Sequence, residues 1–371
     1  MKTRAPASSR RAKPVPARER VGEYHRRLMD ATGQRLAYAG ENVADWQRRL
    51  RRKLRQLLGA VPADRTPVRT THLWTRPHRL GTIQKILIHS GSDYAFPAYV
   101  CLPKAAEPPY QFVICLQGHS TGMHKSIGVS LRSETRPEPS EGDRDFAIGC
   151  MSRGLAALCI EQRAFGETSL HLDRSPSCKL PAMQALMLGR TLLAERIHDV
   201  DRGIDYLESR PDAVMSRIAV MGNSGGGTTA LFAAALLPRI AMAMPASCFC
   251  TFRESILAVR HCECNYVPNL WKYAEMSDIA GLIAPRPLVL VNGRDDTIFP
   301  IQGARRAFRS LKTIYRACGA ESRCHIVIGN GGHRFYADDA WPVFLRYLRK
   351  SPEPSAKTAP GRRSSRVPLP G

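Results

Sequence analysis

The sequence lacks any uninterrupted run of about 18 apolar residues, so we expect no transmembrane helix. The basic residues 1–20 also lack the apolar segment of an export signal, which makes a cytoplasmic protein the expectation. A disulfide framework is not expected either. The 11 cysteines are scattered, and several, including Cys101, Cys115 and Cys159, stand in apolar runs typical of buried thiols in a reducing compartment.

Acidic residues are scarce, since 32 Asp and Glu oppose 55 Lys and Arg. The excess of positive charge lies mostly at the ends of the chain. Residues 1–80 hold 20 basic against 6 acidic residues, and residues 350–371 hold 5 against 1. No nucleic-acid motif and no interleaved aromatic residues accompany this charge, so we interpret it as solvated basic tails and expect no specific nucleic-acid partner. A nucleic-acid-binding arm is the alternative.

Composition and hydrophobic pattern divide the chain into four segments. Residues 1–20 and 351–371 are rich in Arg, Pro and Ser and are predicted to be disordered basic tails. Residues 21–80 are predicted to form a helical extension, because apolar residues recur at helical spacing between basic ones. We expect this apolar stripe to pack on the main domain, residues 81–350, in preference to a membrane surface. The stripe comprises Val43, Trp46, Leu50, Leu54 and Leu57.

The main domain alternates between short β-branched runs and helical stretches. This order predicts an α/β fold with a mostly parallel, doubly wound sheet of about eight strands, helices on both faces and an initial antiparallel pair. Cys248–Leu282 interrupts the rhythm and is predicted to be an insertion or long loop near the ligand site. The predicted strands are 82–89, 97–102, 111–117, 155–161, 218–221, 241–245, 288–292 and 325–328. The predicted helices are 145–153, 181–209, 226–237, 301–318 and 339–349.

A glycine-flanked serine stands between a predicted strand and a predicted helix, in Gly222-Asn223-Ser224-Gly225-Gly226. A sharp strand-to-helix turn of the form G-x-S-x-G exposes its serine at the sheet edge, and a helix N-terminus favours developing negative charge there. We therefore predict Ser224 as a nucleophile. A phosphate-binding loop is the alternative, but the segment has neither a Lys-Ser/Thr ending nor the G-x-G-x-x-G pattern.

A serine nucleophile needs a base to take its proton and an acid to orient that base. In this architecture the order along the chain is Ser, Asp or Glu, then His. Asp296 follows the predicted strand 288–292 and is the preferred acid, with the adjacent Asp295 as the fallback. His333 follows the last predicted strand after a glycine-rich loop and is the predicted base.

The tetrahedral intermediate of acyl transfer needs two N–H donors for its oxyanion. Gly225, the residue after the predicted nucleophile, supplies one of them. The other is expected from residues 119–121, which follow the predicted strand 111–117, and His119 is the preferred donor. An ordinary glycine turn is the alternative interpretation of that loop.

Taken together, these segments resemble the α/β-hydrolase superfamily, and within it the branch of acetyl xylan esterases and dienelactone-hydrolase-like serine esterases. The resemblance spans about residues 80–350 and implies an α/β-hydrolase catalytic domain that cleaves small carboxylic esters through an acyl-enzyme, without a cofactor. Dienelactone hydrolases use cysteine as nucleophile, so Ser224 argues against that activity. The matching segments are Leu116–Ser120, Glu161–Glu167, Gly222–Gly226, Asp278–Pro287, Gly293–Pro300 and Gly331–His333.

Two other functions compete with a serine esterase. A peptidase of the prolyl-oligopeptidase type would need a large gating domain, for which the chain has no room. A catalytically silent fold used as a binding module would not need an intact Ser, Asp and His set. No oligomeric state is predicted.

The segment 248–264 contains soft metal ligands, in Cys248-Phe249-Cys250 and His261-Cys262-Glu263-Cys264. Neither pair has the C-x₂-C spacing of common zinc sites, so no metal is expected. Tyr266, Trp271 and Tyr273 follow and are interpreted either as pocket lining or as packing residues.

Overall fold

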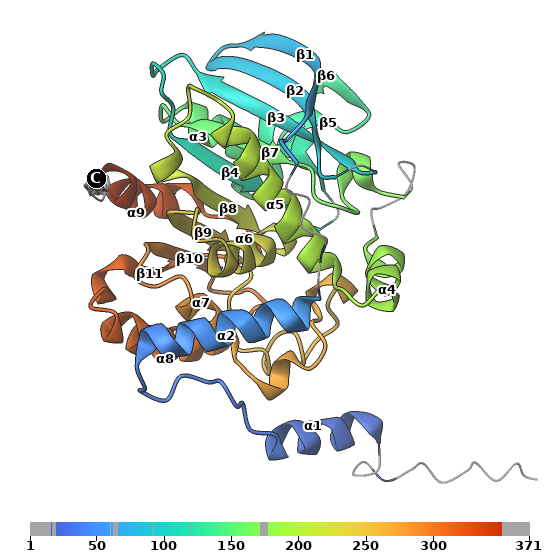
Figure 1. Ribbon diagram of the computed structural model, residues 1–371, viewed down its shortest axis with the longest axis vertical. Coiled ribbons are helices and arrows are strands. Elements are labelled where there is room, and N and C mark those ends of the chain that lie inside the picture. The colour runs from blue at the N-terminus through green and yellow to red at the C-terminus, as the bar shows by residue number, and fades with distance from the viewer. Residues whose placement is uncertain are drawn as a thin grey trace, which may run out of the picture.

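The computed structural model describes residues 16, 20–59, 61, 66–91, 93–119, 121–170 and 177–350. The predicted tails, 1–20 and 351–371, therefore lie almost entirely outside the described residues. Nine of the described strands form one sheet, in the order β1-β2-β3-β7-β4-β8-β9-β10-β11 (Figure 1). These strands are β1 (Thr70–His78), β2 (Gly81–His89), β3 (Ala95–Pro103), β4 (Phe112–Leu116), β7 (Ala156–Ile160), β8 (Ala219–Asn223), β9 (Met242–Ala246), β10 (Leu288–Gly293) and β11 (Cys324–Gly329). A separate small sheet pairs β5 (Val129–Ser130) with β6 (Ser133–Pro137).

The large sheet is mostly parallel, as predicted. Each neighbouring pair of strands is parallel in the series β7, β4, β8, β9, β10 and β11. The strands β1, β2 and β3 are antiparallel to their neighbours and form one end of the sheet. The predicted antiparallel pair corresponds to β2 and β3, in which Gly81 lies opposite Pro103 and His89 opposite Ala95.

The strand β1 lies within residues 21–80, the segment predicted to form a helical extension, and corrects that prediction for residues 70–78. The strand pairs with β2 from Thr70, opposite Ile88, to His78, opposite Gly81, with a shift of register between His72 and Trp74. Most of its side chains are exposed or half-exposed, so the strand carries no alternating hydrophobic signal. Backbone pairing at the edge of the sheet, and not burial, decides the conformation of this segment.

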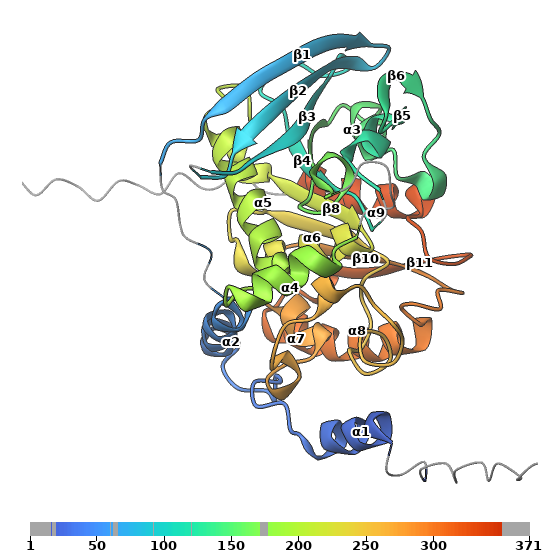
Figure 2. The same cartoon turned by 90° about the vertical axis from the view of Figure 1, so that its right-hand side faces the viewer.

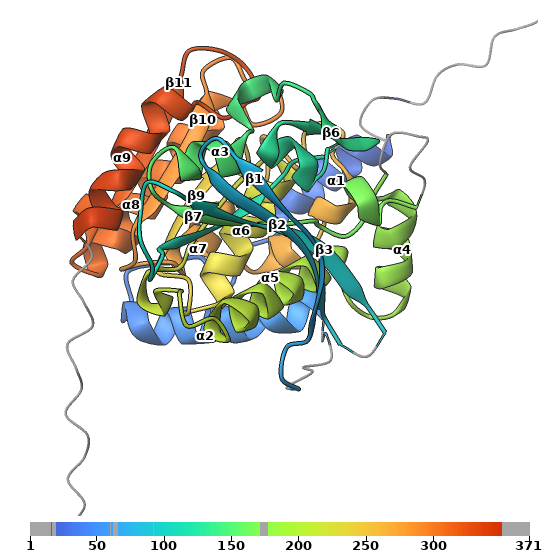
Figure 3. The ribbon, with the colours of Figure 1, turned by 90° about the horizontal axis from the view of Figure 1, so that it is seen from above.

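Helices cover both faces of the sheet. One core combines sheet side chains with α2, α5, α6, α7 and α8, and the other combines them with α3 and α9. The view from above shows α2 and α5 on one side of the strands and α3 on the other (Figure 3). The helices are α1 (Val21–Ala31), α2 (Val43–Leu58), α3 (Phe146–Met151), α4 (Lys179–Met187), α5 (Leu192–Glu208), α6 (Gly225–Leu236), α7 (Met276–Gly281), α8 (Ile301–Ala317) and α9 (Ala337–Lys350). None of these described helices is long and apolar enough to cross a membrane.

The apolar stripe of α2 packs on the main domain. Trp46, Leu50 and Leu54 are fully buried against the core that α6 and α7 share. The basic face of α2 also makes specific contacts, because Arg51 and Arg55 donate to the carbonyl oxygens of Ala235 and Leu236 at the C-terminal end of α6. Cations at the C-terminal end of a helix pair with carbonyl oxygens that have no partner within the helix, and they interact favourably with the negative end of the helix dipole.

The helix predicted over residues 181–209 is divided in two. The helix α4 ends at Met187, Gly189 takes a left-handed conformation with φ of 76°, and α5 begins after Thr191. The Thr191 side chain accepts a hydrogen bond from the N–H of Ala194 and caps α5. As a result α4 stands apart from α5 beside the carboxyl ends of the central strands, as Figure 2 shows.

Candidate active site

The four loops that carry the predicted site residues all follow parallel strands at their carboxyl ends. His119 follows β4, Ser224 follows β8, Asp296 follows β10 and His333 follows β11. In the sheet, β4 neighbours β8, and β10 neighbours β11, with β9 between the two pairs. Parallel strands end at a common edge, so this order brings the four residues to one side of the sheet.

Ser224 occupies a strained turn between β8 and α6. Its backbone has φ of 55° and ψ of −119°, a conformation that residues with a side chain seldom adopt. The turn is held by its backbone, because the Ser224 N–H donates to the Ala246 carbonyl and the Ser224 carbonyl accepts from the Thr228 N–H, both at 2.8 Å. The serine hydroxyl is thus presented at the N-terminus of α6, in the manner of a nucleophile elbow.

The glycines of the turn are required by its close packing. A β-carbon on Gly226 would overlap with the carbonyl oxygen of Leu116 at the end of β4. A β-carbon on Gly222 would overlap with the backbone of Gly226. Both contacts are with backbone atoms, which cannot rotate away as a side chain can. The spacing G-x-S-x-G therefore follows from the distance between β4, β8 and the start of α6.

His333 and Asp296 form a hydrogen-bonded pair. Nδ1 of His333 lies 2.8 Å from Oδ2 of Asp296. The other carboxylate oxygen of Asp296 accepts from the backbone N–H groups of Ile298 and Phe299, at 2.8 and 3.0 Å. The Asp296 side chain is fully buried, whereas 24% of the His333 side chain is exposed. This arrangement holds the ring through Nδ1, and among the described residues no hydrogen bond occupies Nε2.

The environment of Asp296 keeps its carboxylate charged. Burial raises its pKa, but the hydrogen bond and charge of His333, together with the backbone N–H groups of Phe299 and Ile298, hold the pKa below its ordinary value. Asp295, the fallback acid, lies exposed in the turn, where its backbone N–H donates to the Gly331 carbonyl. The structure therefore brings Asp296, and not Asp295, against the imidazole.

Ser224 and His333 line two pockets, a smaller one of about 250 Å³ that Arg144 and Arg334 also line, and a larger one of about 430 Å³. Among the described residues, no hydrogen bond joins the Ser224 hydroxyl to His333; such contacts are often long in unliganded enzymes. The remaining residues that line the 430 Å³ pocket are His119, Ser177, Cys178, Arg260, His261, Cys262, Glu263, Asn265, Ile298 and Phe299.

The loop after β4 packs directly on the serine turn. A β-carbon on Gly118 would lie 3.2 Å from Cβ of Ser224, and one on Gly225 would lie 2.6 Å from Cε1 of His119. Within the described part of the chain, no hydrogen bond uses the backbone N–H of Gly225 or of His119. Ser120, the second residue of the predicted donor region 119–121, lies outside the described residues. The Thr121 hydroxyl donates to the Gly118 carbonyl.

The buried carboxyl group of Glu161 accepts hydrogen bonds from the segment that follows this loop and from the segment that follows β7. Oε1 of Glu161 accepts from the N–H of Met123, and Oε2 accepts from the N–H of Glu167, both at 3.1 Å. The neighbouring Gln162 donates to the Gln117 carbonyl at 2.6 Å. Burial raises the pKa of Glu161 from 4.5 to about 8, against the lowering effect of the two N–H groups. The motif 161–167 thus ties the predicted oxyanion loop to the segment after β7.

These features agree with the comparisons with known proteins. The model of the Abhydrolase family matches residues 15–313 of the chain. The chain belongs to the Abhydrolase family. The Bacillus subtilis (strain 168) protein YtaP, whose name describes it as a hydrolase, is 27% identical over 291 residues, which span 76% of this chain and 92% of YtaP.

Solved structures share the fold at low sequence identity. A Bacteroides fragilis NCTC 9343 protein described as an acetyl xylan esterase superposes with a TM-score of 0.69 at 16% identity, covering 86% of this chain and 83% of the other. A glucuronoyl esterase from Solibacter usitatus gives a TM-score of 0.62 at 15% identity, with coverages of 86% and 97%. An acetyl xylan esterase from Paenibacillus sp. R4 gives 0.55 at 18% identity, with coverages of 87% and 98%. The α/β-hydrolase fold is therefore shown.

Sequence reasoning missed the residues that support His333. The Phe299 ring stacks on the imidazole, with ring centroids 5.9 Å apart and an angle of 15° between the planes. Ser247, whose φ is 48°, donates from its hydroxyl to the carbonyl of Arg334 and so holds the histidine loop. His261 packs edge-on against Phe299 and lines the same pocket. Phe299 belongs to the segment Gly293–Pro300, which carries part of the family resemblance, but neither of its ring contacts has a signal in the sequence.

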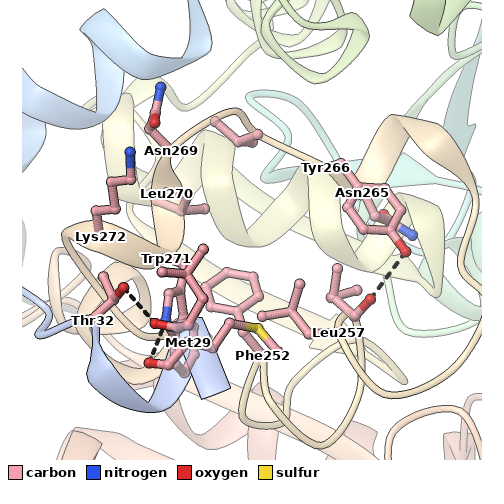
Figure 4. Close-up of a pocket in the computed structure, with 13 residues that line it drawn as sticks. Met29, Thr32, Phe252, Leu257, Asn265, Tyr266, Asn269, Leu270, Trp271 and Lys272 are labelled. Carbon is pink, nitrogen blue, oxygen red and sulfur yellow. Dashed lines mark hydrogen bonds between the residues drawn. The ribbon is translucent and has the colours of Figure 1, made fainter. Parts of the chain in front are cut away.

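The aromatic residues Tyr266 and Trp271 line a different cavity. This cavity, of about 310 Å³, lies between α1 and the segment 252–272 (Figure 4). The Trp271 indole N–H donates to the Met29 carbonyl at the end of α1. Tyr273 instead lies under the cationic groups of Arg35 and Lys53. Within the described part of the chain, none of the three aromatic residues lines the pocket that contains Ser224.

The soft ligands of segment 248–264 are close together in the sequence but do not form one group in the structure. Cys262 and Cys264 join His119 and Cys178 in one cluster beside the pocket. Cys248 and Cys250 belong to the core that covers α6, and His261 lies toward Phe299. The cluster therefore draws its members from three distant segments, which is why local spacing did not predict it.

Proposed function

We propose that this protein is a serine hydrolase of small carboxylic esters, with Ser224 as nucleophile, His333 as general base and Asp296 as the residue that orients His333. The observation that carries the proposal is the buried Asp296–His333 hydrogen bond beside a serine with a strained, positive-φ backbone at the same sheet edge. The chemistry needs no cofactor, because the pair supplies the proton transfers and the loops supply the oxyanion donors.

The reaction proceeds by acyl transfer in two steps. Nε2 of His333 takes the hydroxyl proton as Oγ of Ser224 attacks the ester carbonyl, and the negative oxygen is held by the N–H groups of Gly225 and His119. The carbon–oxygen bond to the leaving group then breaks, and His333 returns the proton to the departing alcohol. Water attacks the acyl-enzyme by the same sequence and releases the carboxylic acid.

The substrate class is supported by the size of the pocket and by the relatives. A volume of about 430 Å³ suits a small-molecule ester. Two of the similar solved structures are described as acetyl xylan esterases. We therefore propose an acetyl-esterase-like activity on short acyl groups.

The decisive experiment compares Ser224→Ala with Ser310→Ala in p-nitrophenyl acetate hydrolysis. Ser310 is exposed on α8 and is not among the residues that line the pockets of Ser224, so its variant controls for the loss of a serine hydroxyl. Ser224→Ala should abolish turnover with unchanged circular dichroism, and Ser310→Ala should retain it. Hydrolysis by Ser224→Ala at the wild-type rate would overturn the proposal.

A fluorophosphonate probe separates the proposal from a catalytically silent fold. The wild-type protein should be labelled at Ser224, because the probe reports an activated nucleophile and does not depend on the acyl group. An unlabelled wild-type protein would favour a binding module. A panel of esters of increasing acyl length, with acetylated sugars and a prolyl peptide substrate, then tests the substrate class, and preferential peptide cleavage would overturn the esterase assignment.

A further inference from the structure

A cluster of one imidazole and three thiols borders the pocket that contains Ser224. Nε2 of His119 lies 3.0 Å from Sγ of Cys264, and Sγ of Cys264 lies 3.4 Å from Sγ of Cys262. With Sγ of Cys178, the four atoms all lie within 4.8 Å of one another. His119 comes from the turn after β4, Cys178 directly precedes α4, and the other two cysteines flank Glu263 at the start of a 3₁₀ turn.

The spacing of these atoms fits a tetrahedral metal. Zinc binds thiolate sulfur at about 2.3 Å and imidazole nitrogen at about 2.0–2.1 Å, so the ligand atoms of a tetrahedral site lie roughly 3.5–3.8 Å apart. The distances within the cluster, from 3.0 Å to at most 4.8 Å, lie around this value. Small side-chain rotations would equalise them. Three sulfurs and one nitrogen are a ligand set that selects zinc among the common divalent ions.

A buried arginine supplies independent evidence that these sulfurs carry negative charge. The Arg196 side chain is 2% exposed, and its guanidinium donates to Sγ of Cys264 at 3.2 Å and to Sγ of Cys178 at 3.1 Å. Its other hydrogen bonds go to the carbonyl oxygen of Arg163. Among the described residues it makes no ion pair with a carboxylate, and a buried guanidinium requires a counter-charge.

The charges of a zinc complex balance. Three thiolates carry three negative charges, a divalent zinc ion carries two positive charges, neutral His119 carries none, and Arg196 adds one positive charge. The net charge of the buried assembly is therefore zero. Three thiolates beside Arg196 without a metal would leave two uncompensated negative charges in a low-dielectric site. Three neutral thiols would leave the guanidinium uncompensated. A single thiolate would balance the guanidinium without a metal, so the charge count requires at least one thiolate, and the grouping of His119 with all three sulfurs is what points to a metal.

Four other buried cysteines of the chain provide a contrast. Cys101, Cys115, Cys150 and Cys159 gather in the core between the sheet and α3, where apolar side chains surround them. Neither an imidazole nor a guanidinium is hydrogen-bonded to any of these four within the described part of the chain. They are packing thiols, so a group of sulfurs alone does not define the site at His119. The histidine and the buried arginine distinguish it.

We propose that His119, Cys178, Cys262 and Cys264 bind one structural zinc ion. Four protein ligands close the coordination sphere, so the metal does not polarise the substrate. It connects the turn that follows β4 to α4 and to residues 262–264, and these segments line the pocket. The effect of the metal on catalysis rests on the proposed function, in which the His119 N–H binds the oxyanion. The binding of the metal does not rest on the proposed function. The proposal replaces the expectation of no metal.

The first test measures metal in the full-length protein purified without chelators. Mass spectrometry of metals should find about one zinc per chain in the wild type and in Cys318→Ser, whose half-buried cysteine lies outside the cluster. Cys178→Ser and Cys264→Ser should lose the metal. A wild-type protein that holds no zinc and takes up none when zinc is added would overturn the proposal, as would a disulfide that joins Cys178 to Cys262 or Cys264 in peptide mass mapping.

A second test avoids variants that fail to fold. Cobalt exchanged into the wild-type protein should give the intense thiolate-to-metal bands and visible bands of a tetrahedral site, and a mercurial reagent titrated against the protein should release the ion. Cobalt spectra of an octahedral oxygen site would overturn the assignment.

Activity measurements separate the two proposals. Ser224→Ala should lose esterase activity but keep the zinc. Removal of zinc from the wild type should lower kcat for p-nitrophenyl acetate by at least about tenfold, because the oxyanion donor moves. A zinc-loaded wild type without hydrolase activity would overturn the proposed function and not the metal site. Unchanged kcat after zinc removal would overturn the positioning role.

Discussion

The imidazole of His119 lies against the backbone of Gly225, so that a β-carbon on Gly225 would stand 2.6 Å from Cε1 of the ring. The two residues belong to different loops, after β4 and after β8, yet they are the two proposed oxyanion donors. The same ring contacts Cys264 through Nε2. One side chain thus connects the serine turn with the sulfur cluster.

Substitution of Gly225 by Ala should reduce activity more than stability. The three atoms nearest to the new β-carbon all belong to the His119 ring, so the substitution presses on a side chain and shifts the neighbouring N–H donor. We therefore expect kcat to fall roughly 10²-fold, as for loss of one oxyanion donor. Gly226→Ala is the contrasting variant, because its β-carbon would overlap with the Leu116 carbonyl. It should lower the free energy of unfolding by about 3 kcal/mol or more. Urea unfolding and steady-state kinetics would be measured for both variants. Equal losses of stability and of kcat in Gly225→Ala and Gly226→Ala would contradict this expectation.

Asp296→Asn should leave the fold intact and lower kcat by roughly 10³–10⁴-fold. An amide can no longer hold His333 in the tautomer that accepts the serine proton, although the size of the side chain is unchanged. Asp295→Asn, one residue away in the exposed part of the same turn, is the matched control and should retain nearly full activity. Equal losses in the two variants, measured with p-nitrophenyl acetate, would argue that the turn and not the carboxylate is important.

Glu161→Gln should change the pH dependence of stability. The folded-state pKa of Glu161 is raised to about 8, mainly by burial, so its favourable contribution is complete below the unfolded pKa near 4.5 and is lost as the pH rises to about 8. Glutamine resembles the protonated acid at every pH. Denaturant titrations at several pH values should therefore show wild-type stability declining relative to Glu161→Gln between about pH 5 and 8. Parallel curves for the two proteins would refute the raised pKa.

Two aspartates on α5 should differ sharply in their importance for stability. Asp199 is buried and accepts two hydrogen bonds from Arg163 and one from Ser90, at 2.6–2.9 Å. Asp199→Ala leaves the Arg163 cation without its main partner and should lower the free energy of unfolding by about 3–5 kcal/mol. Asp201→Ala, which removes an exposed partner of Arg239, should cost at most about 1 kcal/mol. Thermal unfolding with similar midpoints for both variants would be inconsistent with this difference.

Much of the fold was predictable because its signals are local. Short β-branched runs bounded by glycines predicted the parallel strands, and the spacing of Trp46, Leu50 and Leu54 predicted α2. Two segments were predicted wrongly for physical reasons. The exposed edge strand β1 has no hydrophobic alternation, and the apolar pattern of 181–209 conceals the break at Gly189, which takes a left-handed φ.

The candidate site divides in the same way. The sequence by itself determined that Ser224, Asp296 and His333 follow strand ends in this order, after β8, β10 and β11, because a glycine-flanked serine turn and parallel-strand loops have local patterns. The sequence favoured Asp296 and kept Asp295 as the fallback, and the tertiary structure places Asp296 against His333, since adjacent residues in a turn point in different directions. Only the tertiary structure brought Cys178 to His119, because the sheet order and the position of α4, and not chain spacing, decide which distant side chains meet.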